Sequence, residues 1–84
     1  MSSEEPGDVS AATIDVRGLD VPRALIATRD AYRRLAAGES LGIVADPGPE
    51  VDQAIASYFE KRRHFYELTR PGAGQVRIRV TRPN

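Results

Sequence analysis

The sequence predicts a two-layer α/β sandwich in the order βαβαββ, in which a four-stranded mixed sheet carries two helices on one face. Two stretches repeat their apolar residues with the 3.6-residue period of a helix, and each follows a short stretch typical of a strand. The C-terminal region then alternates apolar and polar residues after a glycine-rich turn, as a β-hairpin does. Two right-handed crossovers that progress in one direction place both helices on the same face of the sheet, so the other face is expected to meet solvent.

The first strand and helix are predicted from residues 13–17 and 22–37. Polar and apolar residues alternate over 13–17, as in a half-buried strand. Asp20 is suited to cap the helix that follows, and Pro22 suits its first turn, where no backbone N–H is needed. Gly38 is expected to end this helix in the left-handed conformation. The buried stripe of the helix is expected to comprise Leu25, Thr28, Tyr32, Leu35 and Ala36.

The rest of the chain supplies a second helix between a short apolar strand and a hairpin. Residues 41–45 are almost wholly apolar and predict a central strand. A helix is expected to begin at residue 49 or 50 and to close at 61–64, with a buried face formed by Val51, Ala54, Ile55, Tyr58 and Phe59. Residues 65–69 and 75–81 are predicted strands, joined by a turn.

Length and composition predict one small domain with no cofactor or metal. The chain has 84 residues and a net charge of zero. Residues 1–12 are expected to form a disordered tail, and residues 13–84 the folded domain. The absence of cysteine excludes disulfides, thiolate metal sites and cysteine nucleophiles within the chain. No apolar run approaches the ~20 residues of a membrane span, and no signal peptide opens the chain, so a cytoplasmic protein without a membrane partner is expected.

The titratable residues near the helix ends are expected to be structural. Paired carboxylates can do acid–base work or hold a hard cation, but near helix starts they more often act as caps. The single histidine, His64, follows a basic helix end, where a cation complements the helix dipole. An enzyme that uses these groups is therefore less favoured than a protein-binding module or a nucleic-acid-binding domain, the other two functional classes considered. The carboxylates in question are Asp15, Asp20, Asp46, Glu50 and Asp52.

The turn before the first helix resembles the signature of a known family. The segment reads Asp15-Val16-Arg17-Gly18-Leu19-Asp20-Val21-Pro22-Arg23-Ala24. It is similar to the pattern of the TusA/SirA-like sulfur carriers (sulfurtransferase TusA family), in which a strand and a D-x-R-G-L-type turn precede C-P-x-P at a helix start. The resemblance runs without a gap into the second strand and covers roughly residues 13–81. The matching order of strands and helices supports it.

This resemblance implies a sulfur-carrier homologue that has lost its reactive group. In the family, the cysteine before the helix-opening proline carries a persulfide sulfur and passes it to partner proteins. A thiolate there meets free N–H donors and the positive end of the helix dipole, which lower its pKa. Val21 occupies this cysteine position, and Ala24 replaces the second proline. Valine has no nucleophile, so sulfur transfer by this chain alone is excluded and the protein is not expected to be an enzyme.

The function predicted first is a non-catalytic, protein-binding or regulatory module related to sulfur trafficking, with a sulfur-relay protein as a candidate partner. An apolar residue in place of the reactive cysteine, beside a partly exposed Ile26, would make a small docking patch. The opposing interpretation is that Val21 folds back onto the core as a staple before the helix. The residues predicted to bind a partner are Arg17, Asp20, Val21, Pro22, Arg23 and Ile26.

The alternative function is nucleic-acid binding on the open face of the sheet. Arg77 and Arg79 alternate with apolar residues and are expected on that face, with Arg17 near them, where all three would contact phosphates. Tyr66 would add base stacking if it faced the same side. The acidic neighbours expected to pair with these arginines, and so to weaken this case, are Asp15 and Glu67.

Overall fold

The computed structural model describes residues 11–48, 50–72 and 74–83, and it has the predicted βαβαββ order. The bounds of its elements are β1 (Ala11–Asp15), α1 (Val21–Arg33), β2 (Ser40–Ala45), α2 (Val51–Lys61), β3 (Tyr66–Gly72) and β4 (Gln75–Thr81). None of the helices within these ranges is long and apolar enough to cross a membrane.

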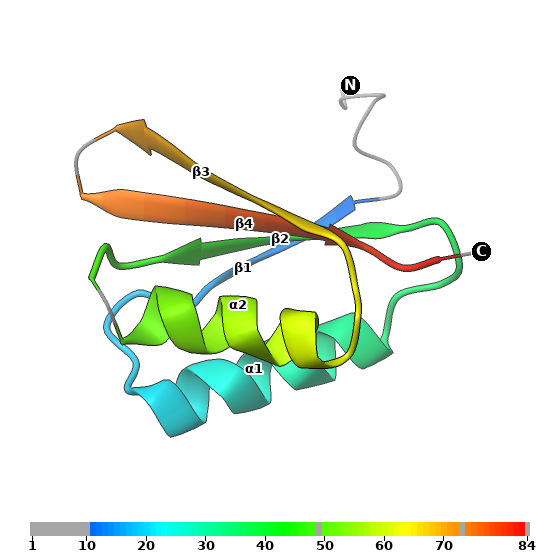
Figure 1. Cartoon of the computed structure of the whole chain (residues 1–84), viewed down its shortest axis with the longest axis horizontal. Helices are drawn as coiled ribbons and strands as arrows, with labels where there is room; N and C mark the ends of the chain where they lie inside the picture. The colour runs from blue at the N-terminus through cyan, green and yellow to red at the C-terminus, as the bar shows by residue number, and fades with distance from the viewer. Residues whose placement is uncertain (1–10, 49, 73, 84) are drawn as a thin grey trace, which may run out of the picture.

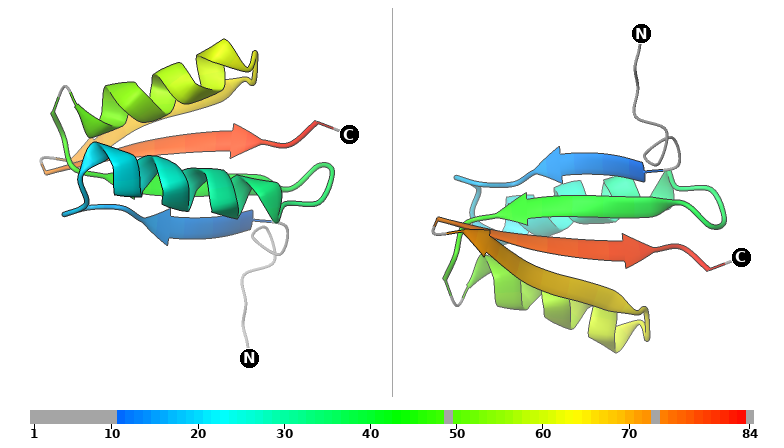
Figure 2. Two further views of the ribbon diagram at one scale, coloured as in Figure 1. Left: turned by 90° about the horizontal axis from the view of Figure 1, so that it is seen from below. Right: turned by 90° about the horizontal axis from the view of Figure 1, so that it is seen from above.

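The four strands form one mixed sheet in the order β1-β2-β4-β3. β1 runs parallel to β2, and β4 runs antiparallel to both of its neighbours. Figure 1 shows α1 and α2 side by side on one side of this sheet. The right-hand view of Figure 2 looks onto the opposite face, which no described helix covers. The predicted two-layer sandwich, with both helices on one face, is therefore confirmed.

The core lies between the sheet and the two helices. β4 alternates as predicted, with three apolar side chains facing the helices and polar side chains facing away. Phe59 and Ile55 of α2 are completely buried against these strands. Burial of such side chains is worth about 1.5–3 kcal/mol each, so this layer supplies most of the driving force for folding. The buried apolar residues are Val16, Ala24, Leu35, Leu41, Ile43, Ala45, Ile55, Phe59, Val76, Ile78 and Val80.

Helix α1 is shorter than predicted, and its buried face is shifted. It ends at Arg33 instead of residue 37, because the chain then turns to bury Leu35. Gly38 has the expected positive φ of 86°, but it lies in the turn before β2 and does not cap the helix. On the helix, Ala24 and Thr28 are fully buried. Ala36, expected in the buried stripe, lies beyond the helix and is exposed.

The other boundaries differ from the predictions by a few residues. β1 begins at Ala11, two residues before the expected start of the folded domain, and the rest of the expected tail lies outside the described residues. α2 ends at Lys61, because Arg63 adopts a left-handed φ of 61° and His64 donates its N–H back to the Phe59 carbonyl. As a result β3 starts at Tyr66, and Phe65 lies just before it.

Candidate functional site

The turns after β1 and β2 meet at one end of the sheet. Gly18 adopts a φ of +82°, and its N–H donates to the Asp46 carboxylate at 2.8 Å. The two turns enclose a shallow hollow of about 510 Å³ beside the start of α2. Asp46 therefore links the two turns. The expectation that it caps a helix is wrong. The residues that line this hollow are Gly18, Leu19, Asp20, Asp46, Pro47, Gly48, Glu50 and Val51.

The start of α1 is held by a cap and by Leu19. Asp20 accepts a hydrogen bond from the Arg23 N–H at 3.0 Å, which confirms its predicted capping role. Leu19, directly before the cap, packs against the core, and Ala24 is buried four positions into the helix. These are the two positions of a hydrophobic staple. Leu19 therefore occupies the position that the opposing interpretation had assigned to Val21.

Val21 and its neighbours consequently remain at the surface. Val21 is only half-buried and is not among the apolar side chains that pack on the core. Ile26 is 51% exposed, as expected, and it lies one turn along the helix from the exposed Pro22. Arg23 is exposed beside them. We call Val21, Pro22, Arg23 and Ile26 the α1 surface.

Arg17, the remaining predicted partner residue, lies in an ion pair with Asp15. Its Nη2 is 2.8 Å from Asp15 Oδ2, and its Nε and backbone N–H also donate to that carboxylate. These hydrogen bonds lower the pKa of Asp15 to about 2 and raise the pKa of Arg17. Asp15 is thus paired with Arg17 and, among the described residues, forms no salt bridge with the arginines of β4, and Arg17 does not line the hollows that Arg77 and Arg79 line.

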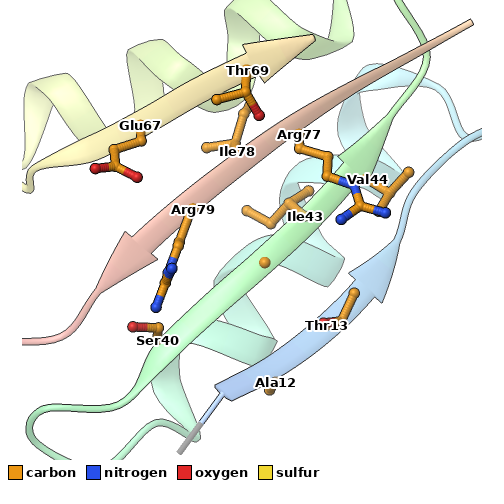
Figure 3. Close-up of a pocket in the computed structure, with 11 residues that line it drawn as sticks. Ala12, Thr13, Ser40, Ile43, Val44, Glu67, Thr69, Arg77, Ile78 and Arg79 are labelled. Atoms are coloured by element: carbon orange, nitrogen blue, oxygen red, sulfur yellow. The ribbon is translucent and has the colours of Figure 1, made fainter. Parts of the chain in front are cut away.

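The uncovered face of the sheet carries a groove that the sequence did not reveal. It has a volume of about 430 Å³ and runs over β1, β2, β4 and β3. Figure 3 shows Arg77 and Arg79 with their guanidinium groups directed toward β2, beside Val44 and Ser40 respectively. We call this the sheet-face groove. Its lining residues are Ala12, Thr13, Ser40, Gly42, Ile43, Val44, Glu67, Thr69, Arg77, Ile78 and Arg79.

The expected pairing of these arginines with acidic neighbours is not observed. Asp15 is occupied by Arg17, and Glu67 lies opposite Arg79 in the strand register without forming an ion pair with it. Within residues 11–48, 50–72 and 74–83, neither Arg77 nor Arg79 takes part in a salt bridge. Arg79 avoids Glu67 because its side chain extends toward β2 (Figure 3). The predicted pairing is therefore wrong for these two arginines, although Glu67 still lies beside Arg79 in the lining of the groove.

Tyr66 does not supply the stacking surface that the alternative function considered. It packs against the core on the helix side, and its hydroxyl donates to Glu60 of α2. This hydrogen bond is the main reason why the pKa of Tyr66 is raised. The aromatic ring near the uncovered face is instead Phe65, which is 95% exposed and lines a second hollow together with Glu67 and Arg79.

The remaining titratable candidates differ in their surroundings. Glu50 precedes α2 but makes no capping hydrogen bond. Asp52, also expected to be a cap, is buried instead, and its Oδ2 lies 3.9 Å from the Arg70 guanidinium. His64 is half-buried and packs against Tyr32, with ring centroids 4.9 Å apart and the ring planes tilted by 39°. Among the described residues, no three histidine, cysteine or acidic side chains are grouped as a metal site would need.

Comparison with known proteins yields a fold relationship. No protein-family model and no curated protein matches the sequence. A solved structure, the SirA-like protein from Desulfitobacterium hafniense, matches with a TM-score of 0.74. The match covers 87% of this chain and 99% of that chain, at 19% sequence identity. The chain therefore has the fold of a SirA-like protein, as the resemblance of its first turn had implied.

Proposed function

We propose that this chain is a non-catalytic relative of the SirA-like sulfur carriers that binds a protein partner through the α1 surface and thereby regulates sulfur trafficking. The chain has no cysteine, so a persulfide has no sulfur to form on. The chain keeps the fold of a carrier without its reactive group. The surface at the start of α1 is the part of a carrier that its partners would contact. The expected cellular site of such a role is the cytoplasm.

The observation that carries the proposal is the exposure of apolar side chains at the start of α1. Ile26 is 51% exposed and is one of two large apolar side chains that are exposed within the described residues. Val21 beside it is half-buried without packing on the core, because Leu19 fills the staple position. Neither side chain belongs to the core cluster or to the residues that pack against it. An apolar patch edged by Arg23 has the composition of a small protein interface.

The partner we propose is a cysteine-bearing sulfur-relay protein. The α1 surface presents a valine where a carrier presents its cysteine, so a relay protein could dock without exchanging sulfur. Binding of this kind would block or hold a relay protein, which is a regulatory effect. Arg23 adds a cation at the edge of the patch, suited to an acidic rim on the partner.

A site-specific photo-crosslinking experiment tests this proposal. A photoreactive amino acid replaces Ile26 in the full chain, and a matched control carries it at Ser57, which is exposed on α2. Crosslinked proteins from the source cells are identified by mass spectrometry, and the relay protein found is then purified for a direct binding measurement. We expect binding that the Val21→Asp substitution weakens at least tenfold, because a charge would enter an apolar contact.

The same substitution should leave the fold intact. An acidic residue in the first helical turn interacts favourably with the helix dipole, and Val21 contributes nothing to the core cluster. The melting temperature of Val21→Asp is therefore expected to stay close to that of the natural chain. A large fall in melting temperature, equal crosslinking at Ser57, or crosslinking only to a second copy of the chain would each contradict the proposal.

A further inference from the structure

The sheet-face groove is separate from the α1 surface and has the properties of a ligand site. Its volume of about 430 Å³ lies within the range of small-molecule and nucleotide sites. Gly42 adds no side chain to its floor, where a Cβ would lie 3.5 Å from Thr13 Oγ1 in ordinary contact. Ser40 and Thr13 supply hydroxyl groups along the wall (Figure 3). The groove thus combines a low floor with hydrogen-bonding sides.

The charge in the groove suits phosphate. Arg77 and Arg79 are two residues apart on β4, so their side chains leave the same face about 6.8 Å apart. Both lack a salt-bridge partner among the described residues, and both extend over β2 (Figure 3). Paired guanidinium groups that form no salt bridge are strong ligands for phosphate oxygens.

An exposed aromatic ring continues the groove. A second hollow of about 340 Å³ adjoins it, and the two hollows share Glu67 and Arg79 in their linings. Phe65 lines this second hollow and is 95% exposed, more than any other large apolar side chain in the described chain. A ring that packs on nothing is unfavourable in water and available to stack on a flat partner. The two hollows together form one continuous surface from Arg77 past Arg79 to Phe65, which we call the track.

We propose that this track binds single-stranded nucleic acid, with one base stacked on Phe65 and the adjoining phosphates held by Arg79 and Arg77. Arginines along a groove with an aromatic platform at its end are the elements by which single strands are bound. A duplex is disfavoured because its bases are already stacked and cannot reach the ring. An acidic peptide would satisfy the arginines but offers no flat group to Phe65. Glu67, which lines both hollows, opposes binding and limits its strength.

Fluorescence anisotropy with a labelled single-stranded oligonucleotide of mixed sequence, about 12 nucleotides long, tests the proposal. We expect Phe65→Ala to weaken binding roughly tenfold. The double substitution Arg77→Gln/Arg79→Gln should reduce the slope of log affinity against log salt by about 1.4, because two phosphate contacts are lost. The substitution Glu67→Gln removes a repelling charge and should tighten binding roughly threefold.

A matched control separates this site from general charge attraction. Arg33→Gln/Arg34→Gln removes the same charge from the exposed end of α1, in the other layer, and should leave both the affinity and the salt slope nearly unchanged. The proposal is overturned if the oligonucleotide does not bind, if the control weakens binding as much as the β4 pair, or if Phe65→Ala has no effect. Equal affinity for free mononucleotides would also overturn it, since the site would then be a nucleotide pocket and not a strand track.

Discussion

The two faces of β4 carry side chains of opposite character, apolar and buried on one face and charged and exposed on the other. Toward the helices, Val76, Ile78 and Val80 are at most 1% exposed and pack in the core. Toward the uncovered face, Arg77 and Arg79 are exposed and unpaired within the described chain. Because successive strand residues point to opposite faces, each side is free to be selected for a different property. The helix side provides stability, and the uncovered side carries the residues that we propose bind a nucleic acid.

This difference indicates where function can be sought in a small domain. The buried side is constrained by close packing, which the loss or gain of even one methylene disturbs. The exposed arginines and the exposed Phe65 have no such structural reason to be there. Side chains whose removal costs little stability are therefore the ones that indicate function, and substitutions on the two faces are expected to change different properties.

The largest expected effect separates the two faces directly. Ile78→Ala deletes buried methyl groups from a fully enclosed position and should lower the free energy of unfolding by about 2–5 kcal/mol. Arg79→Ala, one residue along the same strand, should change it by no more than about 0.5 kcal/mol. Urea unfolding followed by circular dichroism measures both. Similar losses in the free energy of unfolding for the two variants would show that the arginine side also contributes to stability.

The fold and the start of α1 could be predicted because they depend on local patterns. The alternation of 75–81 fixed both the strand and the faces of its side chains. Asp20 could be identified as a cap because its chemistry acts three residues away. The exposure of Ile26 followed from its angle on the helix. Each of these required only the sequence within one turn or strand.

The groove could not be predicted, because its parts come from distant segments. Thr13, Ser40 and Arg79 meet only through the strand order and register, which the sequence does not encode locally. A glycine inside a strand, Gly42, was the one local signal of a close approach. The sequence predicted that Phe65 begins the third strand, but β3 begins at Tyr66, and the reason for this difference is local. The left-handed turn that ends α2 at Arg63 has no glycine to mark it, so the strand start shifted by one residue.

A smaller effect is expected from a polar defect on the helix side. Thr28 is fully buried, and its hydroxyl has no hydrogen-bond partner within the described residues. An unsatisfied buried hydroxyl costs about 1–3 kcal/mol, so Thr28→Val, which keeps the shape, should raise the free energy of unfolding by about 1 kcal/mol. Thr28→Ser is the matched control, since it keeps the hydroxyl and loses the methyl group, and it should be less stable than the natural chain. A loss of stability in Thr28→Val would mean that the hydroxyl is satisfied in solution.

The smallest effect tests the ion pair on the uncovered side. The hydrogen bonds from Arg17 hold the pKa of Asp15 at about 2 in the folded chain, below its ordinary value of 3.8. A carboxyl whose pKa falls on folding stabilises the fold above that ordinary value, and this contribution is lost as the pH falls toward about 2. The melting temperatures of the natural chain and of Asp15→Asn should therefore differ slightly at neutral pH and converge between pH 3.8 and about 2. Arg17→Gln removes the same interaction from the other partner and should show the same convergence. If the melting temperatures of the natural chain and of Asp15→Asn stay apart at the lowest pH, the difference comes from packing at Asp15, and the uncovered face contributes to stability through more than this ion pair.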